Sequence, residues 1–184
     1  MSDAQPSVLE TPSGKDVAYE NFPVGSWLLS RRVRLHVLCF YRFARAADDI
    51  ADNETLSVEE KIARLDRFGD ALSGRETHDS ACETAHKMRE SLVVTGVSPQ
   101  HCADLLTAFK LDVTKLRYRN WDDLIGYCTL SAVPVGRYLL DLHGGSRDDY
   151  VASDALCLAL QVINHLQDCR DDYLNLNRVY LPQD

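Results

Sequence analysis

Two short stretches of the sequence place oxygen-bearing side chains one helical turn apart. The first holds Asp48 and Asp52, and the second holds Asn164, Asp168 and Asp172, each four residues from the next. With a rise of about 1.5 Å per residue, neighbours in such a column lie about 6 Å apart along the helix axis. Carboxylates at this spacing repel each other by about 0.2–0.5 kcal/mol. The spacing suits two or three hard cations bridged by a shared anion better than one ion in a closed cage.

Mg²⁺ and a diphosphate fit this arrangement, because Mg²⁺ takes one or two protein carboxylates together with substrate phosphate oxygens. Each column continues an apolar helical stripe, which for the first column consists of Val33, Val37, Tyr41 and Ala44. A core-facing stripe that turns acidic near the end of a helix indicates a site. Taken alone, either stretch could instead be a solvated helix end, because most runs of charged residues are solvent-exposed surface. The two columns together are more specific than either one.

The apolar periodicity predicts an all-α chain. Gly and Pro are sparse and no alternating strand pattern persists. Capping residues and glycines set the expected helix boundaries. Pro134 is expected to kink the helix over residues 121–144. We expect one helical-bundle domain over residues 15–184 and a disordered tail over residues 1–14. The expected helices cover about residues 31–51, 58–74, 82–95, 99–117, 121–144 and 148–174.

Composition excludes several classes of protein. The net charge is −8 without a basic cluster, which argues against nucleic acid as a partner. No apolar run approaches about 18 residues, so no transmembrane segment is expected. The first 15 residues lack an apolar signal core. These features predict a cytoplasmic enzyme, with peripheral membrane contact left open because a lipid product would favour it. The six cysteines have irregular spacing without C-x-x-C, and Cys39, Cys128 and Cys157 lie within apolar helical patterns, which indicates that these three are buried, reduced packing residues.

The acidic motifs resemble those of squalene and phytoene synthases. Segment 45–52 reads Arg-x-x-Asp-Asp-x-x-Asp, and segment 164–172 reads Asn-x-x-x-Asp-x-x-x-Asp with Arg-Val-Tyr-Leu-Pro following at 178–182. Segments 20–24 and 127–137 are most similar to the bacterial hydroxysqualene synthase branch of that family. The resemblance extends over about residues 15–184, in the family's order and spacing.

The resemblance implies a helical bundle of the class I isoprenoid synthase type that stops before the family's C-terminal helices. It also implies Mg²⁺ as cofactor and a prenyl diphosphate as substrate. The implied metal ligands are Asp48, Asp52, Asn164, Asp168 and Asp172, and the four aspartates are also the implied catalytic residues. The implied substrate-binding residues are Asn21, Tyr41, Arg45, Asp49, Tyr127, Ser131, Gln161, Arg178 and Tyr180.

The activity that the branch resemblance implies is the conversion of presqualene diphosphate and water to hydroxysqualene and diphosphate, in squalene and hopanoid biosynthesis. Such an enzyme is a carbon–oxygen lyase or transferase. The nearest alternative is head-to-head prenyl transfer, in which two farnesyl diphosphates give presqualene diphosphate or a phytoene-type product. A further alternative is a non-catalytic assembly factor of the same fold. Loss of motif carboxylates would favour the assembly factor, and both motifs are intact.

Overall fold

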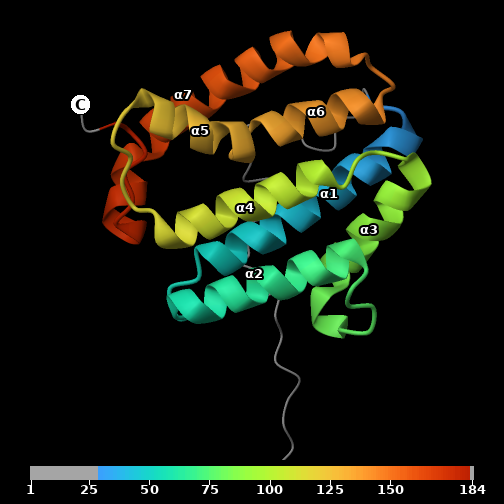
Figure 1. The fold of residues 1–184 in the computed structure, drawn as a ribbon, viewed down its shortest axis with the longest axis horizontal. Helices are drawn as coiled ribbons and strands as arrows, with labels where there is room; N and C mark the ends of the chain where they lie inside the picture. The colour runs from blue at the N-terminus through green and yellow to red at the C-terminus, as the bar shows by residue number, and fades with distance from the viewer. Residues whose placement is uncertain (1–28, 183–184) are drawn as a thin grey trace, which may run out of the picture. The chain divides into compact units, whose positions relative to one another are not determined.

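The computed structural model of the chain describes residues 29–182, which form seven α-helices joined by short connections (Figure 1). No β-strand occurs in this range, where only Arg117 and Val179 form an isolated bridge. The all-α prediction is therefore confirmed. The expected tail over residues 1–14 and the candidate Asn21 lie outside the described residues. The helices are α1 (Arg31–Ala51), α2 (Val58–Ser73), α3 (Glu83–Thr95), α4 (Gln100–Thr114), α5 (Trp121–Ser131), α6 (Val133–Leu142) and α7 (Tyr150–Leu176), with 3₁₀ turns η2 (Ser80–Cys82) and η3 (Arg147–Asp149).

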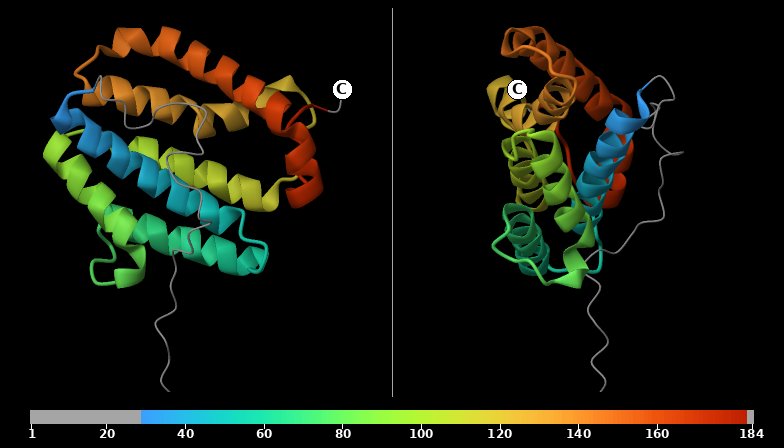
Figure 2. Two further views of the ribbon diagram at one scale, coloured as in Figure 1. Left: turned by 180° about the vertical axis from the view of Figure 1, so that it is seen from behind. Right: turned by 90° about the vertical axis from the view of Figure 1, so that its right-hand side faces the viewer.

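The chain divides into two compact units, Met1–Pro99 and Gln100–Asp184. In the first unit, α1, α2 and α3 pack against one another (Figure 2). Ser57 and Glu60 form the predicted capping box at the start of α2, and Gly74 ends that helix with φ of 79°. Phe43 of α1 stacks on Phe68 of α2 with ring centroids 5.2 Å apart, and both rings are fully buried. This aromatic pair fixes the contact between α1 and α2.

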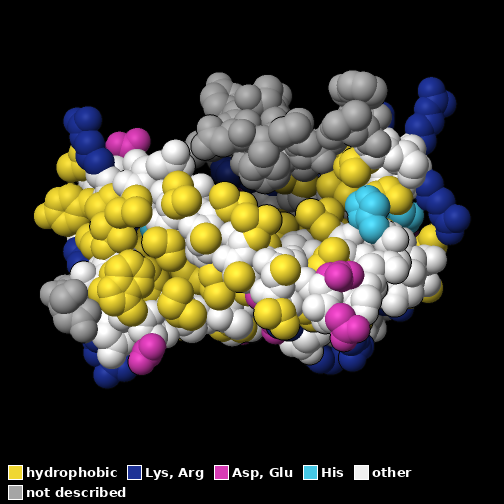
Figure 3. Space-filling view, turned by 90° about the horizontal axis from the view of Figure 1, so that it is seen from above, with side chains coloured by type: hydrophobic (Ala, Val, Ile, Leu, Met, Phe, Trp, Pro, Cys, Tyr) yellow, Lys and Arg dark blue, Asp and Glu magenta, His cyan; other side chains and the backbone are white. Residues whose placement is uncertain are grey.

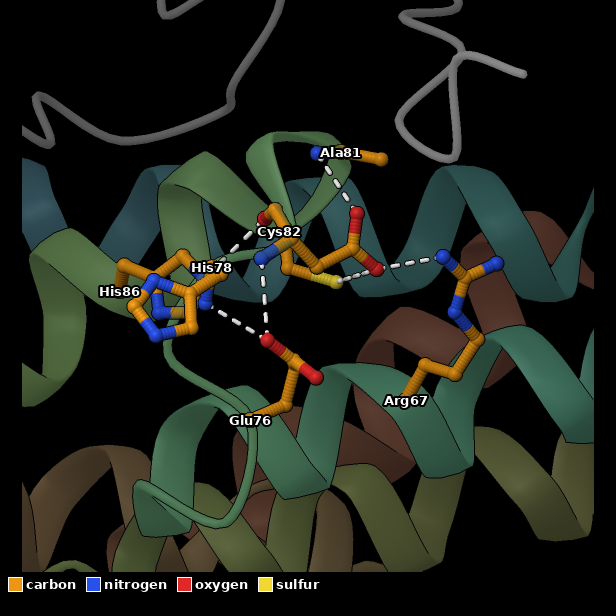
Figure 4. Close-up of polar contacts among 7 residues, drawn as sticks. Arg67, Glu76, His78, Ala81, Cys82 and His86 are labelled. Carbon is orange, nitrogen blue, oxygen red and sulfur yellow. Dashed lines mark hydrogen bonds and ion pairs between the residues drawn. The ribbon is translucent and has the colours of Figure 1, made fainter. Parts of the chain in front are cut away.

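The connection between α2 and α3 is held by a network of hydrogen bonds and an ion pair, to which Arg67, Glu76 and His86 contribute (Figure 4). Arg67 of α2 forms an ion pair with the Asp79 carboxylate, whose other oxygen accepts a hydrogen bond from the Ala81 backbone N–H at 3.0 Å. His86 of α3 donates Nε2–H to the Asp79 carbonyl at 3.1 Å. Glu76 Oε1 accepts hydrogen bonds from the backbone N–H groups of His78 at 2.6 Å and Asp79 at 3.1 Å. These contacts satisfy the polar groups of the connection, which is therefore scaffold.

In the second unit, α5 and α6 follow one another end to end, and α7 packs along both (Figure 1). The predicted continuous helix over 121–144 is wrong in one respect, because the chain breaks at Ala132 into two helices. Pro134 lies in the first turn of α6, where its missing N–H is tolerated. The prediction for α4 is also corrected, since that helix ends at Thr114 instead of near residue 117.

The packing of α6 on α7 depends on a glycine and on ion pairs. A Cβ at Gly136 would lie 2.6 Å from both Ser153 Oγ and Cys157 Sγ of α7. Next to it, Arg137 donates two hydrogen bonds to the Asp154 carboxylate, through Nε at 2.9 Å and Nη2 at 2.5 Å. The small residues beside Pro134 therefore include one that permits close approach of two helices.

One face of α7 is apolar and exposed (Figure 3). Leu156, Leu160 and Ile163 follow one another at four- and three-residue steps, so they lie on the same side of the helix. No other part of the described chain buries them. Seven large apolar side chains of α7 are at least 49% exposed, namely Val151, Leu156, Leu160, Ile163, Leu166, Tyr173 and Leu174.

The contact at Gly136 generates a prediction about stability. We expect Gly136→Ala to lower the free energy of unfolding by about 1–3 kcal/mol, because overpacking against α7 outweighs the gain in helix propensity. The matched control is Gly126→Ala in α5, where a Cβ meets nothing within 4 Å. That variant should gain up to about 1 kcal/mol. Urea unfolding followed by circular dichroism measures both, and equal effects of the two substitutions would contradict the packing role of Gly136.

Candidate active site

The first acidic column lies in the last two turns of α1. Asp48 and Asp52 are half-buried, and Asp49 beside them is 8% exposed. Arg45 forms ion pairs with Asp48 at 3.2 Å and with Asp49 at 2.9 Å. Burial acts to lower the pKa of Arg45, but the two carboxylates outweigh it and raise that pKa above its usual value. Arg45 is therefore a fixed cation at this end of α1.

The predicted register of the α1 stripe needs a correction. The most deeply buried residues at this end of the helix are Phe43, Ala47 and Ile50. Since consecutive residues of an α-helix are rotated by about 100°, Asp48 lies beside this stripe and does not continue it. The column therefore borders the buried face, where its oxygens are half-exposed and accessible to a ligand. Tyr41 is likewise half-buried.

The second column lies in the C-terminal half of α7. Asn164 and Asp168 are exposed and Asp172 is half-buried. The expectation of a buried apolar stripe below this column is wrong for Leu160, which is 51% exposed. The inward face of α7 is instead formed by Leu158, Val162 and His165. Asn164 and Asp168 thus lie on the exposed side of α7, whereas Asp172, two turns after the buried His165, lies close to the packed side.

The donor types of both columns fit Mg²⁺. Among residues 29–182, no group of three or more His, Cys, Asp or Glu side chains converges on one point. Each column offers only oxygen donors, which Mg²⁺ prefers. An ion bound to one or two of these carboxylates takes its remaining ligands from water or from a phosphate. Asp48 and Asp52 would hold such ions on α1, and Asn164, Asp168 and Asp172 would hold them on α7.

A buried cluster of aromatic and charged side chains packs behind the second column. His165 stacks on Tyr180 with ring centroids 3.8 Å apart, and Tyr127 lies 5.1 Å from Tyr180. Asp112 of α4 accepts hydrogen bonds from the Tyr180 hydroxyl at 2.7 Å and from the Tyr127 hydroxyl at 3.0 Å. Arg178 donates to the Asp112 carbonyl at 2.9 Å and to the Tyr180 hydroxyl at 3.2 Å. We call Asp112, Tyr127, His165, Arg178 and Tyr180 the Asp112 cluster.

Burial decides the protonation of this cluster. Burial, followed by the negative charge of Asp112, raises the pKa of Tyr127 and of Tyr180 well above the usual range, so both phenols stay protonated. Burial, assisted by the positive charge of Arg178, lowers the pKa of His165 to about 4. His165 is therefore neutral near pH 7, and its Nε2 is buried without a hydrogen-bond partner.

The segment after α7 is fixed against the connection between α4 and α5. The Val179 N–H donates to the Leu116 carbonyl at 3.0 Å. Arg117 donates to both the carbonyl and the side chain of Asn177, the residue that ends α7 with φ of 51°. These contacts direct Arg178 and Tyr180 inward, where both are buried.

The remaining candidate residues are Ser131, Gln161 and Asn21, which belong to neither acidic column. Ser131 ends α5 at the helix break, and its Oγ is buried without a hydrogen-bond partner. Gln161 is half-buried on α7, one turn before His165. Asn21 lies outside the described residues. Ser131 Oγ thus retains both its donor and its acceptor capacity at the break between α5 and α6.

Sequence analysis singled out neither Asp112 nor His165 as part of a site. A signal for Asp112 exists, because it follows the buried Leu105 and Ala108 at three- and four-residue steps. It is an acid on an apolar stripe, as the first motif was expected to be. Its partners Tyr127 and Tyr180 are 15 and 68 residues away, which no local pattern reveals.

Comparisons with known proteins identify the relatives of the chain. The family model described as squalene/phytoene synthase matches residues 16–184. The chain is 52% identical over 178 residues to the hydroxysqualene synthase of Rhodopseudomonas palustris, covering 97% of this chain and 60% of that protein. It is 53% identical over 165 residues to that of Sinorhizobium fredii, covering 90% of this chain and 56% of that protein. The chain thus spans about 60% of the length of these relatives.

Among solved structures, the fold is similar to squalene synthase HpnC from Alicyclobacillus acidocaldarius. The TM-score is 0.77 at 33% sequence identity, covering 90% of this chain and 62% of that one. These relatives support the isoprenoid synthase type of fold expected from the motifs. No helix within residues 29–182 is long and apolar enough to cross a membrane.

His165 gives a pH dependence of stability. Its folded pKa of about 4 lies below the usual 6.5, so the unfolded chain binds a proton first as the pH falls. The stabilising effect of a neutral His165 is complete above pH 6.5 and is lost between about pH 6.5 and pH 4, by about 3 kcal/mol in all. We expect the unfolding free energy of wild type, measured in urea at several pH values, to fall across this window relative to His165→Gln. Parallel pH curves for the two proteins would contradict this assignment.

Proposed function

Since the chain belongs to the squalene/phytoene synthase family, we propose that it forms part of an enzyme that converts presqualene diphosphate and water to hydroxysqualene and diphosphate. The observation that carries the proposal is the pair of oxygen columns at the ends of α1 and α7, both complete. The branch is supported by about half of the residues being identical to enzymes named hydroxysqualene synthase.

The first chemical requirement is departure of the diphosphate. The carbon–oxygen bond breaks, the electron pair leaves with the diphosphate, and an allylic or cyclopropylcarbinyl cation remains. Mg²⁺ bound by Asp48, Asp52, Asn164, Asp168 and Asp172 would neutralise the charge that develops on the leaving group. These residues supply oxygen donors from two helices that each pack against neighbouring helices of their own unit, so the donors are positioned before substrate binds.

Arg45 is the side chain of this chain best placed to assist the leaving group from α1. Its guanidinium contacts Asp48 and Asp49, and a guanidinium is a planar cation with five N–H donors. A phosphate oxygen accepts such a charge-assisted hydrogen bond well. In this proposal Asp49 orients Arg45, while Asp48 is shared between Arg45 and a metal ion. Tyr41, half-buried one turn earlier, would border the prenyl chain.

The second requirement is capture of the cation by water. The water oxygen forms the new carbon–oxygen bond, and the proton that it loses passes to the released diphosphate. Ser131 Oγ, buried and without a partner, can hold such a water at the break between α5 and α6. Backbone carbonyls at this break would be further acceptors for it. Gln161 would serve as a polar contact to substrate from α7.

Head-to-head coupling of two farnesyl diphosphates is the second candidate function. It is favoured by the 33% identical structure described as a squalene synthase and by a phytoene synthase of Mycobacterium tuberculosis that is 31% identical over 185 residues. Both identities are well below those of the hydroxysqualene synthases. The same acidic columns serve both reactions, so product identity separates the candidates.

The test of function supplies Mg²⁺ and either presqualene diphosphate or farnesyl diphosphate to the complete product of the gene, without a reductant and in ¹⁸O-labelled water. We expect the first substrate to give an alcohol that carries ¹⁸O, since the cation is captured by water, and the second to give little coupling. Mass spectrometry of the extracted lipids reads both results. Unlabelled alcohol, a phytoene-type hydrocarbon, or accumulation of presqualene diphosphate would favour the second candidate.

A second prediction concerns the columns themselves. We expect Asp48→Asn and Asp168→Asn each to lower the rate of diphosphate release about 100-fold or more, because each removes charge that opposes the leaving group through a metal ion. The unfolding free energy should change by less than about 1 kcal/mol, since both side chains are at least partly exposed. Matched controls are Glu54→Gln and Asp171→Asn, which neutralise exposed carboxylates close to the same columns. If the controls lose as much activity, the effect is general charge loss and not metal binding.

Binding of Mg²⁺ and pyrophosphate distinguishes the proposed enzyme from a non-catalytic assembly factor of the same fold. Wild type with both Mg²⁺ and pyrophosphate should melt several degrees higher than with either alone, because a ligand that binds only the native state stabilises it. Asp168→Asn should lose most of this shift while Asp171→Asn keeps it. Identical melting curves with and without the two ligands would overturn the metal-site proposal.

A further inference from the structure

Asp112 occupies an unusual position for a carboxylate. It lies near the end of α4, is 5% exposed, and is absent from both acidic motifs. Its two oxygens accept hydrogen bonds from two different tyrosines, Oδ1 from Tyr180 and Oδ2 from Tyr127. Tyr127 belongs to α5 and Tyr180 to the segment after α7. One side chain therefore connects three separate parts of the second unit.

The direction of these hydrogen bonds is fixed. The raised pKa of both phenols keeps them protonated, and an ionised carboxylate can only accept. Arg178 balances the buried charge from the main-chain side, through the Asp112 carbonyl at 2.9 Å, and donates to the Tyr180 hydroxyl at 3.2 Å. A buried carboxylate with two phenol donors and a neighbouring guanidinium has few alternative arrangements, so the cluster is rigid.

The cluster reaches the second acidic column through His165. The imidazole stacks on the Tyr180 ring at 3.8 Å with 19° between the planes. His165 follows Asn164 directly and precedes Asp168 by three residues. The rotation of this part of α7 about its axis is therefore set on its inner side by a ring whose hydroxyl Asp112 holds.

We propose that Asp112 is a positioning residue for the reaction. Through the hydroxyls of Tyr127 and Tyr180 it fixes the ring on which His165 stacks, and so holds Asn164, Asp168 and Asp172 in the orientation that binds metal and diphosphate. Asp112 itself contacts neither. This inference rests on the proposed function only for the identity of the ligand, because the positioning concerns the second column whatever substrate follows.

The principal test is Asp112→Asn, which keeps the shape of the side chain but removes one of the two acceptor oxygens. Its matched control is Asp104→Asn on the same helix, where the carboxylate accepts only from the exposed Gln100 at 2.7 Å. We expect Asp112→Asn to raise the Mg²⁺ concentration that gives half of the melting shift with pyrophosphate about tenfold or more, the loss typical when support behind a metal ligand is removed. Asp104→Asn should match wild type.

A second variant keeps the proposal testable if Asp112→Asn folds poorly. Tyr180→Phe retains the ring that stacks on His165 and removes only the hydroxyl. It should weaken Mg²⁺ and pyrophosphate binding in the same direction. The double variant Asp112→Asn with Tyr180→Phe should lose less than the sum of the two single losses, because both side chains belong to one hydrogen-bond network. Additive losses, or wild-type metal dependence in folded Asp112→Asn or Tyr180→Phe, would overturn the proposal.

Turnover gives a readout that a purely structural role would not move. In the complete gene product supplied with presqualene diphosphate, Asp112→Asn should lower kcat about 10- to 100-fold, and added Mg²⁺ should restore part of the loss. A loss equal to the unfolded fraction and insensitive to Mg²⁺ would show that Asp112 only stabilises the fold. If wild type does not turn over presqualene diphosphate, the proposed function fails, while the binding measurements with pyrophosphate still decide the role of Asp112.

Discussion

Repulsion between oxygen-bearing side chains on successive helical turns is the constraint on which this structure depends. Within α1 the repulsion is partly offset, because Arg45 lies between Asp48 and Asp49. Within α7 the column stands in the C-terminal half of the helix, where the macrodipole is also unfavourable to anions. These local costs of about 0.2–1 kcal/mol each are offset by contacts elsewhere along each helix. The rest of each unit supplies those contacts.

In the second unit, α7 is held by contacts with buried charged groups as well as by apolar packing. Asp112 and Arg178 are both almost fully buried, which is unfavourable unless every polar group finds a partner. Their partners come from α4, α5 and the segment after α7, so these parts can be satisfied only in one arrangement. Apolar side chains alone would tolerate small rotations of α7, whereas hydrogen bonds of 2.7–3.0 Å at Asp112 do not.

Local signals in the sequence account for much of the fold and for the two columns. Ser57, Glu60 and Gly74 define α2 through capping and a left-handed end, which depend on neighbouring residues only. The columns were likewise visible because periodicity is a local property. The end of α4 was not, since residues 115–119 are compatible with a helix. That end is set by contacts with Asn177 and Val179, about 60 residues away.

The difference between local sequence signals and long-range contacts also explains the errors in the prediction of the candidate site. The register of α1 was misjudged because one residue of rotation separates Ala47, which is fully buried, from Asp48. Periodicity with a step of three or four does not resolve that difference in a helix with apolar residues on more than one side. The Asp112 cluster escaped notice because its members meet only after α4, α5 and α7 have packed.

The uncovered side of α7 gives this stretch of chain the character of an amphiphile. Apolar patches of this kind are rare on monomeric proteins and promote association with other surfaces. In solution, sulfate or phosphate salts would strengthen that association and mild detergents would relieve it. The helix that carries the second oxygen column thus also carries an exposed apolar face, and the two meet where the exposed Ile163 is followed directly by Asn164.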